Sequence, residues 1–284
     1  MPKPPSDVLW QRKDIMLVAA GSGPCLRELY YRAVEQGKLQ QLMFCHTTAD
    51  DYTMGTAEEK ITRVIKRAAA VHGVQVVVLY LNCLDILTRL DFDYLESSLS
   101  EATGIMVRYF FRGPLGKMDI RHFKPVYEFM AELPEEKGCI SHNLYQLPPL
   151  ATDVAGVIDT LPANEAKVLV APSGCRACLR DGDLLEQTQG VYVLETKKQD
   201  FIYGIEDNCV KQCSELMSDG KYKSLNLISS AVAAFIGFDG NWVANSMENN
   251  LKTRSFNMDG FNDAVYGVSC AQELLVEEEQ ELYV

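Results

Sequence analysis

Short apolar runs alternate with amphipathic segments in the first part of the chain. The run at 15–20 leads into Gly-Ser-Gly-Pro-Cys at 21–25, and a helix is predicted from about Leu26. A buried strand, a tight turn and a helix in this order are typical of a parallel sheet. The same pattern predicts further strands at 39–46, 74–81 and 105–111. We therefore expect an α/β fold.

The second part of the chain repeats this order. Its first strands are predicted at 167–171 and 191–195. The segment Asp51-Tyr-Thr-Met-Gly55 matches Asp200-Phe-Ile-Tyr-Gly204 in its acid, aromatic and glycine, and 79–111 aligns without a gap onto 225–257. The sequence predicts two tandem Rossmann-like units with mainly parallel sheets and right-handed crossovers, forming an internal pseudo-dimer.

The repeat sets the expected domain boundaries. The first unit covers residues 1–115, and the second, diverged unit covers residues 167–284. The connector between them, 116–166, contains a predicted helix near 126–132 and a Pro-rich segment at 147–150. We expect it to be the crossover between the units and assign no chemistry to it.

Composition and charge narrow the function classes. The net charge of −12, with no basic cluster, argues against nucleic-acid binding, which depends on Lys and Arg. No apolar run approaches the ~18–20 residues needed to cross a bilayer, and the N-terminus lacks a signal-peptide core. We therefore expect a cytoplasmic protein without a membrane partner. In that compartment its nine cysteines are expected to be reduced.

Three cysteines directly follow predicted strands. They are Cys25, Cys83 and Cys175. In parallel sheets, ligands bind at the carboxyl ends of the strands, where the turns meet a crevice. The sequence thus places three thiols at the functional edges of two related sheets.

Three motifs lie around the cysteines of the first unit. The turn Gly-Ser-Gly-Pro-Cys25 resembles a Gly-Pro-x-Gly-Cys turn with the glycine and proline positions rearranged, and 51–61 resembles D-x-x-x-G-G-x-x-K-L. Asn82-Cys83, followed by Asp91 and Asp93, resembles a cluster-ligand turn of the form E/T-C-x-x-x-x-I-G-D-D. These motifs make the chain similar to the nitrogenase component 1 oxidoreductases, a family that includes protochlorophyllide and chlorophyllide reductases.

The resemblance implies a function. In that family an iron–sulfur cluster at the interface of two homologous chains is held by cysteines from both, and an ATP-hydrolysing iron protein supplies the electrons. For this chain the resemblance implies an oxygen-sensitive oxidoreductase, to be handled anaerobically. Its electrons would come from an ATP-dependent iron-protein partner, since the chain has no Walker A loop of its own. Neither the substrate nor the catalytic residues are implied.

The chain also departs from the family. No cysteine precedes Cys25, the turn at 229–239 resembles the cluster-ligand turn without its cysteine, and the chain is shorter than a family subunit. The resemblance covers about 15–111 and, more faintly, 168–271. This corresponds to the cluster-binding domain only.

The implied cofactor is a [4Fe–4S] cluster. If the two units pack as a pseudo-dimer, Cys25, Cys83 and Cys175 would meet in the crevice between them, and Cys178 is the natural fourth ligand, with an acid as the alternative. Thiolates are soft ligands that suit such a cluster. Cys25 and Cys175 also lie at predicted helix N-termini, where the dipole favours a thiolate.

Packing is the competing interpretation for the cysteines. A cysteine often acts as a small buried hydrophobe, and we expect this role for Cys45, Cys139 and Cys270. Cys209 and Cys213 have an i, i+4 spacing that permits metal ligation, but packing is expected there as well.

Two arginines lie at another predicted strand end. Arg108 and Arg112 could contact an anionic ligand, but a salt bridge to Asp91 or Asp93 is the preferred expectation.

The preferred function is therefore an iron–sulfur redox protein that passes electrons to a substrate not yet identified. Two alternatives stay open: a non-catalytic carrier or scaffold for a metal–sulfur cluster or tetrapyrrole, and a paralogue that has lost its cluster. The sequence leaves open whether the chain is a monomer or a homo-oligomer.

Overall fold

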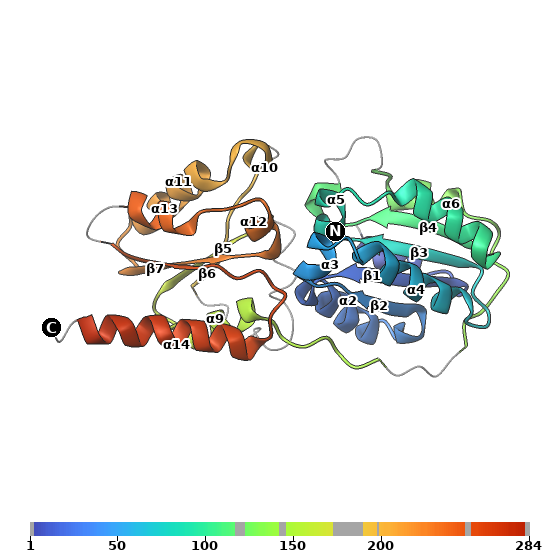
Figure 1. The fold of residues 1–284 in the computed structure, drawn as a ribbon, viewed down its shortest axis with the longest axis horizontal. Coiled ribbons are helices and arrows are strands. Elements are labelled where there is room, and N and C mark those ends of the chain that lie inside the picture. Colours follow the sequence, from blue (N-terminus) through green and yellow to red (C-terminus); the bar gives the residue numbers. More distant parts are fainter. Residues whose placement is uncertain are drawn as a thin grey trace. The chain divides into compact units, whose positions relative to one another are not determined.

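The computed structural model describes residues 3–116, 123–141, 146–172, 190–197, 199–247 and 251–281. The chain divides into two units, residues 1–149 and 150–284, each built on a four-stranded sheet with helices on both faces (Figure 1). Every strand pairing in the two sheets is parallel. The expected α/β class with two tandem Rossmann-like units is confirmed.

The strands of the first unit are the apolar runs of the sequence. They are β1 (Ile15–Gly21), β2 (Leu42–His46), β3 (Val76–Leu81) and β4 (Met106–Phe111). Every residue of β1 and β3 is buried because helices cover both faces of the sheet. The strand order is β2-β1-β3-β4. The chain therefore adds β2 on one side of β1 and then adds β3 and β4 on the opposite side of β1. The carboxyl ends of β1 and β3 are therefore the topological switch point, where such sheets bind ligands.

The helices of the first unit form a layer on each face of this sheet. They are α1 (Pro5–Leu9), α2 (Gly23–Glu35), α3 (Ala49–Thr53), α4 (Ala57–Ala69), α5 (Cys83–Leu87), α6 (Phe92–Thr103), α7 (Gly113–Gly116) and α8 (Val126–Ala131). Alternate residues of β1 face opposite layers, as the period of a strand requires. Met16 and Val18 pack with α4 and α6, whereas Ile15 and Leu17 pack with α1, α2 and α8.

Two element boundaries differ from the expectation. Helix α2 begins at Gly23, before the predicted start, because Pro24 fits the first turn of a helix, where its missing N–H costs nothing. Residues Leu39–Gln41 form the 3₁₀ helix η1 instead of opening β2. The buried Gln41 amide donates to two main-chain carbonyls near the start of β1, at 2.6 and 3.0 Å, which holds this short turn in place.

The second unit repeats the sheet with mostly shorter strands. They are β5 (Ala166–Val170), β6 (Val191–Val193), β7 (Ser224–Ser229) and β8 (Lys252–Phe256), in the order β6-β5-β7-β8. Its helices are α9 (Asp153–Thr160), α10 (Asp200–Tyr203), α11 (Glu206–Met217), α12 (Ala231–Phe235), α13 (Gly240–Ser246) and α14 (Ala264–Glu281). Helices α11 and α13 cover one face of the sheet, and α9 and α14 cover the other (Figure 1).

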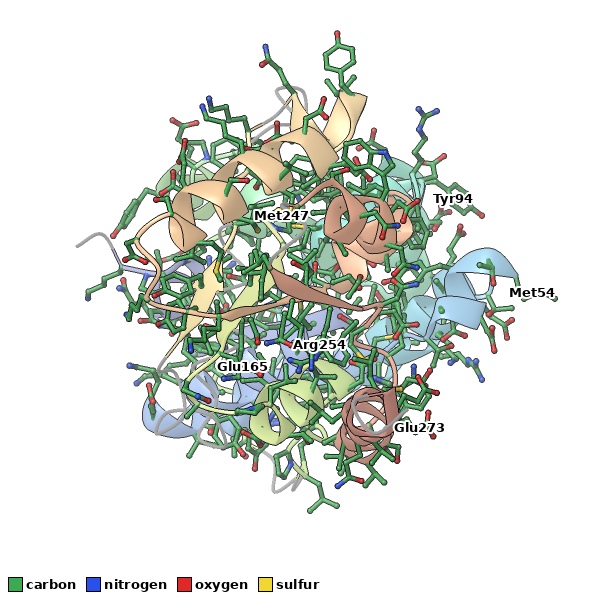
Figure 2. All side chains as sticks on the ribbon, turned by 90° about the vertical axis from the view of Figure 1, so that its left-hand side faces the viewer. Met54, Tyr94, Glu165, Met247, Arg254 and Glu273 are labelled. Carbon is green, nitrogen blue, oxygen red and sulfur yellow. The ribbon has the colours of Figure 1, made fainter. Side chains whose placement is uncertain are left out.

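A buried ion pair lies within this second sheet. Arg254 of β8 donates to the Glu165 carboxylate at 2.6 Å and to the Asn226 side-chain oxygen at 3.0 Å. The Asn226 amide donates to Glu165 at 3.0 Å, and the labelled side chains of Arg254 and Glu165 lie next to each other in Figure 2. Arg254 is only 5% exposed. Because both charged groups have hydrogen-bond partners, the desolvation cost of this burial is offset.

The structure corrects the register of the internal repeat. Asn82 and Ser230 are the N-cap residues of α5 and α12, and Asp91 and Asp239 are those of α6 and α13. The gapless alignment of the sequence is therefore displaced by two residues over β7, α12 and the start of α13. At β8 the gapless alignment is correct again: Lys252 pairs with Ser224 of β7, as Met106 pairs with Val76 of β3. The two-residue difference lies between α13 and β8, because α13 is shorter than the corresponding helix α6.

The expected connector belongs to both units. The division of the chain lies between Pro149 and Leu150. Helix α8 packs Phe129 edge-on against Phe110 of the first sheet, at 5.2 Å between ring centroids. Helix α9 packs against α14 of the second unit, and its residue Val157 is fully buried.

The contact between α9 and α14 yields a stability prediction. A Cβ at Gly267 would lie 2.0 Å from the Asp153 carbonyl oxygen, so the two helices can approach this closely only because the position is glycine. Gly267→Ala should lower the free energy of unfolding by about 2–3 kcal/mol through overpacking. Ser269→Ala, on an exposed position of the same helix, is the matched control and should be neutral or slightly stabilising. Urea denaturation of both variants measures this, and equal effects would contradict the close packing.

Candidate functional site

The carboxyl edge of the first sheet brings Cys25 and Cys83 together. Cys25 lies in the first turn of α2, after β1, and Cys83 is the first residue of α5, after β3. Because β1 and β3 are neighbouring strands, both thiols lie at the switch point of the sheet. Cys83 is 8% exposed and Cys25 is half-buried.

Asn82 joins the two turns that carry these thiols. Its side-chain amide donates to the Ala20 carbonyl of β1 at 2.8 Å, and its side-chain oxygen accepts from the Leu84 N–H at 2.7 Å. Gly21 has a φ of +139°, and a Cβ at this residue would lie 1.7 Å from the Asn82 amide nitrogen. Glycine is therefore required at the end of β1, because the Asn82 side chain occupies the space where any other side chain would begin.

A buried network extends from Asn82 to the end of β2. Asp85 Oδ2 accepts from the Asn82 N–H at 2.9 Å and completes a capping box at the start of α5. Asp85 Oδ1 accepts from the Tyr52 hydroxyl at 2.9 Å, and the Tyr52 oxygen accepts from the Thr47 hydroxyl, also at 2.9 Å. The turns after β1, β2 and β3 are thus linked by one chain of hydrogen bonds.

Burial dominates the electrostatics of this network. Asp85 is fully buried, which raises its pKa to about 6, although the hydrogen bonds from Asn82 and Tyr52 lower it. Burial also raises the pKa of Tyr52 above its usual range, and the Asp85 carboxylate adds to this rise. The Tyr52 hydroxyl therefore keeps its proton and remains the donor to Asp85.

The same effect acts on Cys83. Burial raises the pKa of its thiol to about 12, the Leu115 N–H lowers it by hydrogen bonding, and Cys25 adds to the rise. At neutral pH the Cys83 thiol is therefore protonated in the protein without bound metal. A metal that binds there must displace the proton.

Arg112, directly after β4, brings a positive charge to this edge. It donates to the Cys25 carbonyl at 3.1 Å, lies 4.0 Å from the Glu28 carboxylate and stacks over the Tyr80 ring at 5.2 Å from its centroid. Its charge also lowers the pKa of Cys83, which favours the thiolate form. The guanidinium is thus suited to offset negative charge on thiolate ligands.

The salt bridge expected between Arg108 and Asp91 or Asp93 is wrong. Arg108 pairs with Glu96 at 3.1 Å and with Glu132 at 3.2 Å. The reason is position along α6: Asp91 caps the start of this helix, whereas Glu96 lies further along it, level with the middle of β4. Arg108 is therefore a structural residue of the first unit.

The predicted ligand set is only partly described by the structure. Cys25 and Cys83 lie after the neighbouring strands β1 and β3, whereas Cys175 and Cys178 lie outside the described residues. Within the described ranges, no three His, Cys, Asp or Glu side chains gather in a way that could hold a metal ion. The first unit thus contributes two thiols.

The remaining cysteines test the packing expectation. Cys45 is buried, and burial raises the pKa of its thiol to about 12. Cys209 and Cys213 are buried with their sulfur atoms 3.9 Å apart, and they pack in the core under α11. Cys270 is half-buried. Cys139 is exposed, so core packing was wrong there: it lies in an irregular segment at the edge of the first unit.

Tyr52, Asp85 and Thr47 are members of the site that the sequence did not predict. Tyr52 belongs to a segment that the repeat shares, and its partner Asp85 is 33 positions away. One local feature of the sequence could have identified Asp85: Asn82 followed three residues later by an acid, at a predicted strand-to-helix turn, is typical of a capping box.

The comparisons with known proteins show no family. No protein-family model matches the chain, and no curated protein matches it. One solved structure that is similar is a "putative transcriptional regulator" from Clostridium difficile 630, at 9% identity and a TM-score of 0.23. The match covers 79% of this chain and 65% of that chain, and a similarity this low supports no argument about function. In the part of the chain that the structure describes, no helix has the length and apolar character needed to span a membrane.

The raised pKa of Asp85 yields a pH prediction. The folded protein holds this proton up to about pH 6, whereas an unfolded chain releases it near pH 3.8. The free energy of unfolding should therefore fall by roughly 3 kcal/mol between about pH 4 and 6 through this group alone. Urea denaturation across this range measures it: Asp85→Asn should lose that contribution, and the exposed control Asp50→Asn should keep it. Parallel curves for all three proteins would contradict the assignment.

Proposed function

We propose that this chain is an iron–sulfur redox protein similar to nitrogenase component 1, in which Cys25 and Cys83 supply two of the ligands to a [4Fe–4S] cluster. The observation that supports this best is their position: two cysteines follow the two central strands, at the topological switch point of the first sheet.

The residues around the two thiols fit such a group. Thiolates are the usual ligands of iron–sulfur clusters, and Cys25 lies in the first turn of a 13-residue helix, whose dipole favours an anion. Arg112 adds a positive charge, and Asn82 fixes the distance between the two turns. A four-cysteine cluster needs two more ligands, for which the sequence offers Cys175 and Cys178.

A bound cluster would supply one-electron transfer, and the chain's own residues would set its surroundings. Burial of Cys83 excludes water from one ligand, whereas the half-buried Cys25 leaves a route for assembly. Electrons would come from an ATP-dependent iron-protein reductase, and the acceptor is not identified. The net charge of −12 suits a reductase with a basic docking face.

The first test is metal content. Protein purified anaerobically, or reconstituted with iron and sulfide, should contain about four iron atoms per chain and give an EPR signal when reduced. Cys25→Ala and Cys83→Ala should each lose most of the iron, because each removes a ligand. Cys139→Ala, at an exposed cysteine, is the control and should keep it. An iron-free protein after reconstitution would contradict the proposal, and so would equal iron loss in the control.

A further inference from the structure

The Tyr52–Asp85 pair is costly for a fold to keep. Asp85 is a carboxyl group with no exposed surface, and a carboxyl group is costly to bury. The side chain is tolerated because both oxygens accept hydrogen bonds, from Tyr52 and from the Asn82 N–H. A feature of this cost needs either a structural or a functional reason.

The second unit allows the structural reason to be tested, because it contains the same two turns. Asp51 and Asp200 correspond in the turn after the second strand of each unit: each carboxylate accepts from the main-chain N–H three residues earlier, at 2.7 and 2.6 Å. Asn82 and Ser230 correspond as N-caps of the helix after the third strand.

These two correspondences identify the residues of the second unit that are equivalent to the site residues of the first. Phe201 stands where the first unit has Tyr52. Ala231 and Ala233 stand where it has Cys83 and Asp85. At these three equivalent positions, α10 and α12 of the second unit carry no hydroxyl, carboxylate or thiol. The fold of these turns therefore does not require the Tyr52–Asp85 bond, and the pair is missing where the thiol is missing.

The contacts show how the pair reaches the thiol. The Asp85 carboxylate accepts a hydrogen bond from the Asn82 N–H at 2.9 Å. Cys83, the first residue of α5, lies in the chain between these two partners. The Tyr52 hydroxyl donates to the other Asp85 oxygen and accepts from the hydroxyl of Thr47, the residue after β2. Tyr52, Asp85 and the Asn82 N–H thus form one continuous chain of hydrogen bonds that ends at the turn carrying Cys83.

We propose that Tyr52 and Asp85 act together as positioning residues, which hold the Cys83 turn in the geometry that the thiol site needs. The inference extends the proposed function, since the site they serve is the one assigned to the cluster. It can be tested on the thiol itself, without any cluster. The natural variants are Tyr52→Phe and Asp85→Ala, because the second unit has Phe201 and Ala233 at these positions.

The experiment measures the rate at which iodoacetamide alkylates Cys83 in the metal-free full-length chain, followed by peptide mass spectrometry. Tyr52→Phe should raise this rate about tenfold, the factor that corresponds to one hydrogen bond of ordinary strength. The matched control is Tyr109→Phe, which removes a 3.0 Å Tyr–Asp bond to Asp93 in the same unit, and it should leave the rate unchanged. The buried Cys45 reports general loosening in the two tyrosine variants, and its alkylation rate should not change in Tyr52→Phe or Tyr109→Phe.

The double variant tests whether Tyr52 acts through Asp85. If it does, adding Tyr52→Phe to Asp85→Ala should change the Cys83 rate by less than about twofold, because the bond is already lost. Independent, multiplicative effects would overturn the proposal. So would an unchanged rate in Tyr52→Phe, the same increase in Tyr109→Phe, or a parallel rise at Cys45.

A second readout uses the protein loaded with iron and sulfide. The EPR g-values of the reduced cluster should change in Tyr52→Phe and stay as in the wild type in Tyr109→Phe, since only the first variant alters a ligand turn. Unchanged g-values in Tyr52→Phe would overturn the inference while leaving the cluster in place. If the wild type takes up no iron, the proposed function fails, and the alkylation rates still decide whether Tyr52 positions Cys83.

Discussion

The candidate site depends on the contact between the Asn82 side chain and the end of β1. This side chain lies where a side chain at Gly21 would begin. It donates to Ala20 and accepts from the first turn of α5, so it fastens two strand ends that are far apart in sequence. A side chain at Gly21 would occupy the position of the Asn82 amide, so the glycine is what allows this amide to reach β1. Cys25 and Cys83 lie in the helices that begin at these two turns, so the pairing of β1 with β3 brings them to one edge and the Asn82 contact ties the two turns there.

The two units show that the fold and the chemistry are separable. Both build the same parallel sheet with helices on each face, and both cap the helix after the third strand with a side chain that accepts from the third residue of that helix. The first unit has Cys83 and the buried Asp85 in this helix and Tyr52 after the second strand, where the second unit has Ala231, Ala233 and Phe201. A buried carboxyl group reduces stability near neutral pH, and the second unit forms the corresponding helix α12 with Ala233 in its place.

Much of this arrangement could be predicted from the sequence. Strands β1 and β3 are continuous apolar runs, which identifies buried parallel strands, and the cysteines that follow them had to reach the same edge of the sheet. The register of the repeat could not be found, because a gapless match hides the shorter helix α13. Arg108 pairs with Glu96 because this residue of α6 lies beside the middle of β4. The hydrogen bond between Tyr52 and Asp85 depends on how two turns distant in sequence pack together. Such contacts are set by tertiary packing, and no local pattern specifies them.

The central claim is that the thiols of Cys25 and Cys83 bind one metal centre together. Diffraction at the iron absorption edge, from crystals of the anaerobically reconstituted chain, tests it most directly. The account predicts anomalous density for iron bonded to the sulfur atoms of both residues. Crystals that contain iron elsewhere, or in which both sulfur atoms lack iron, would contradict it.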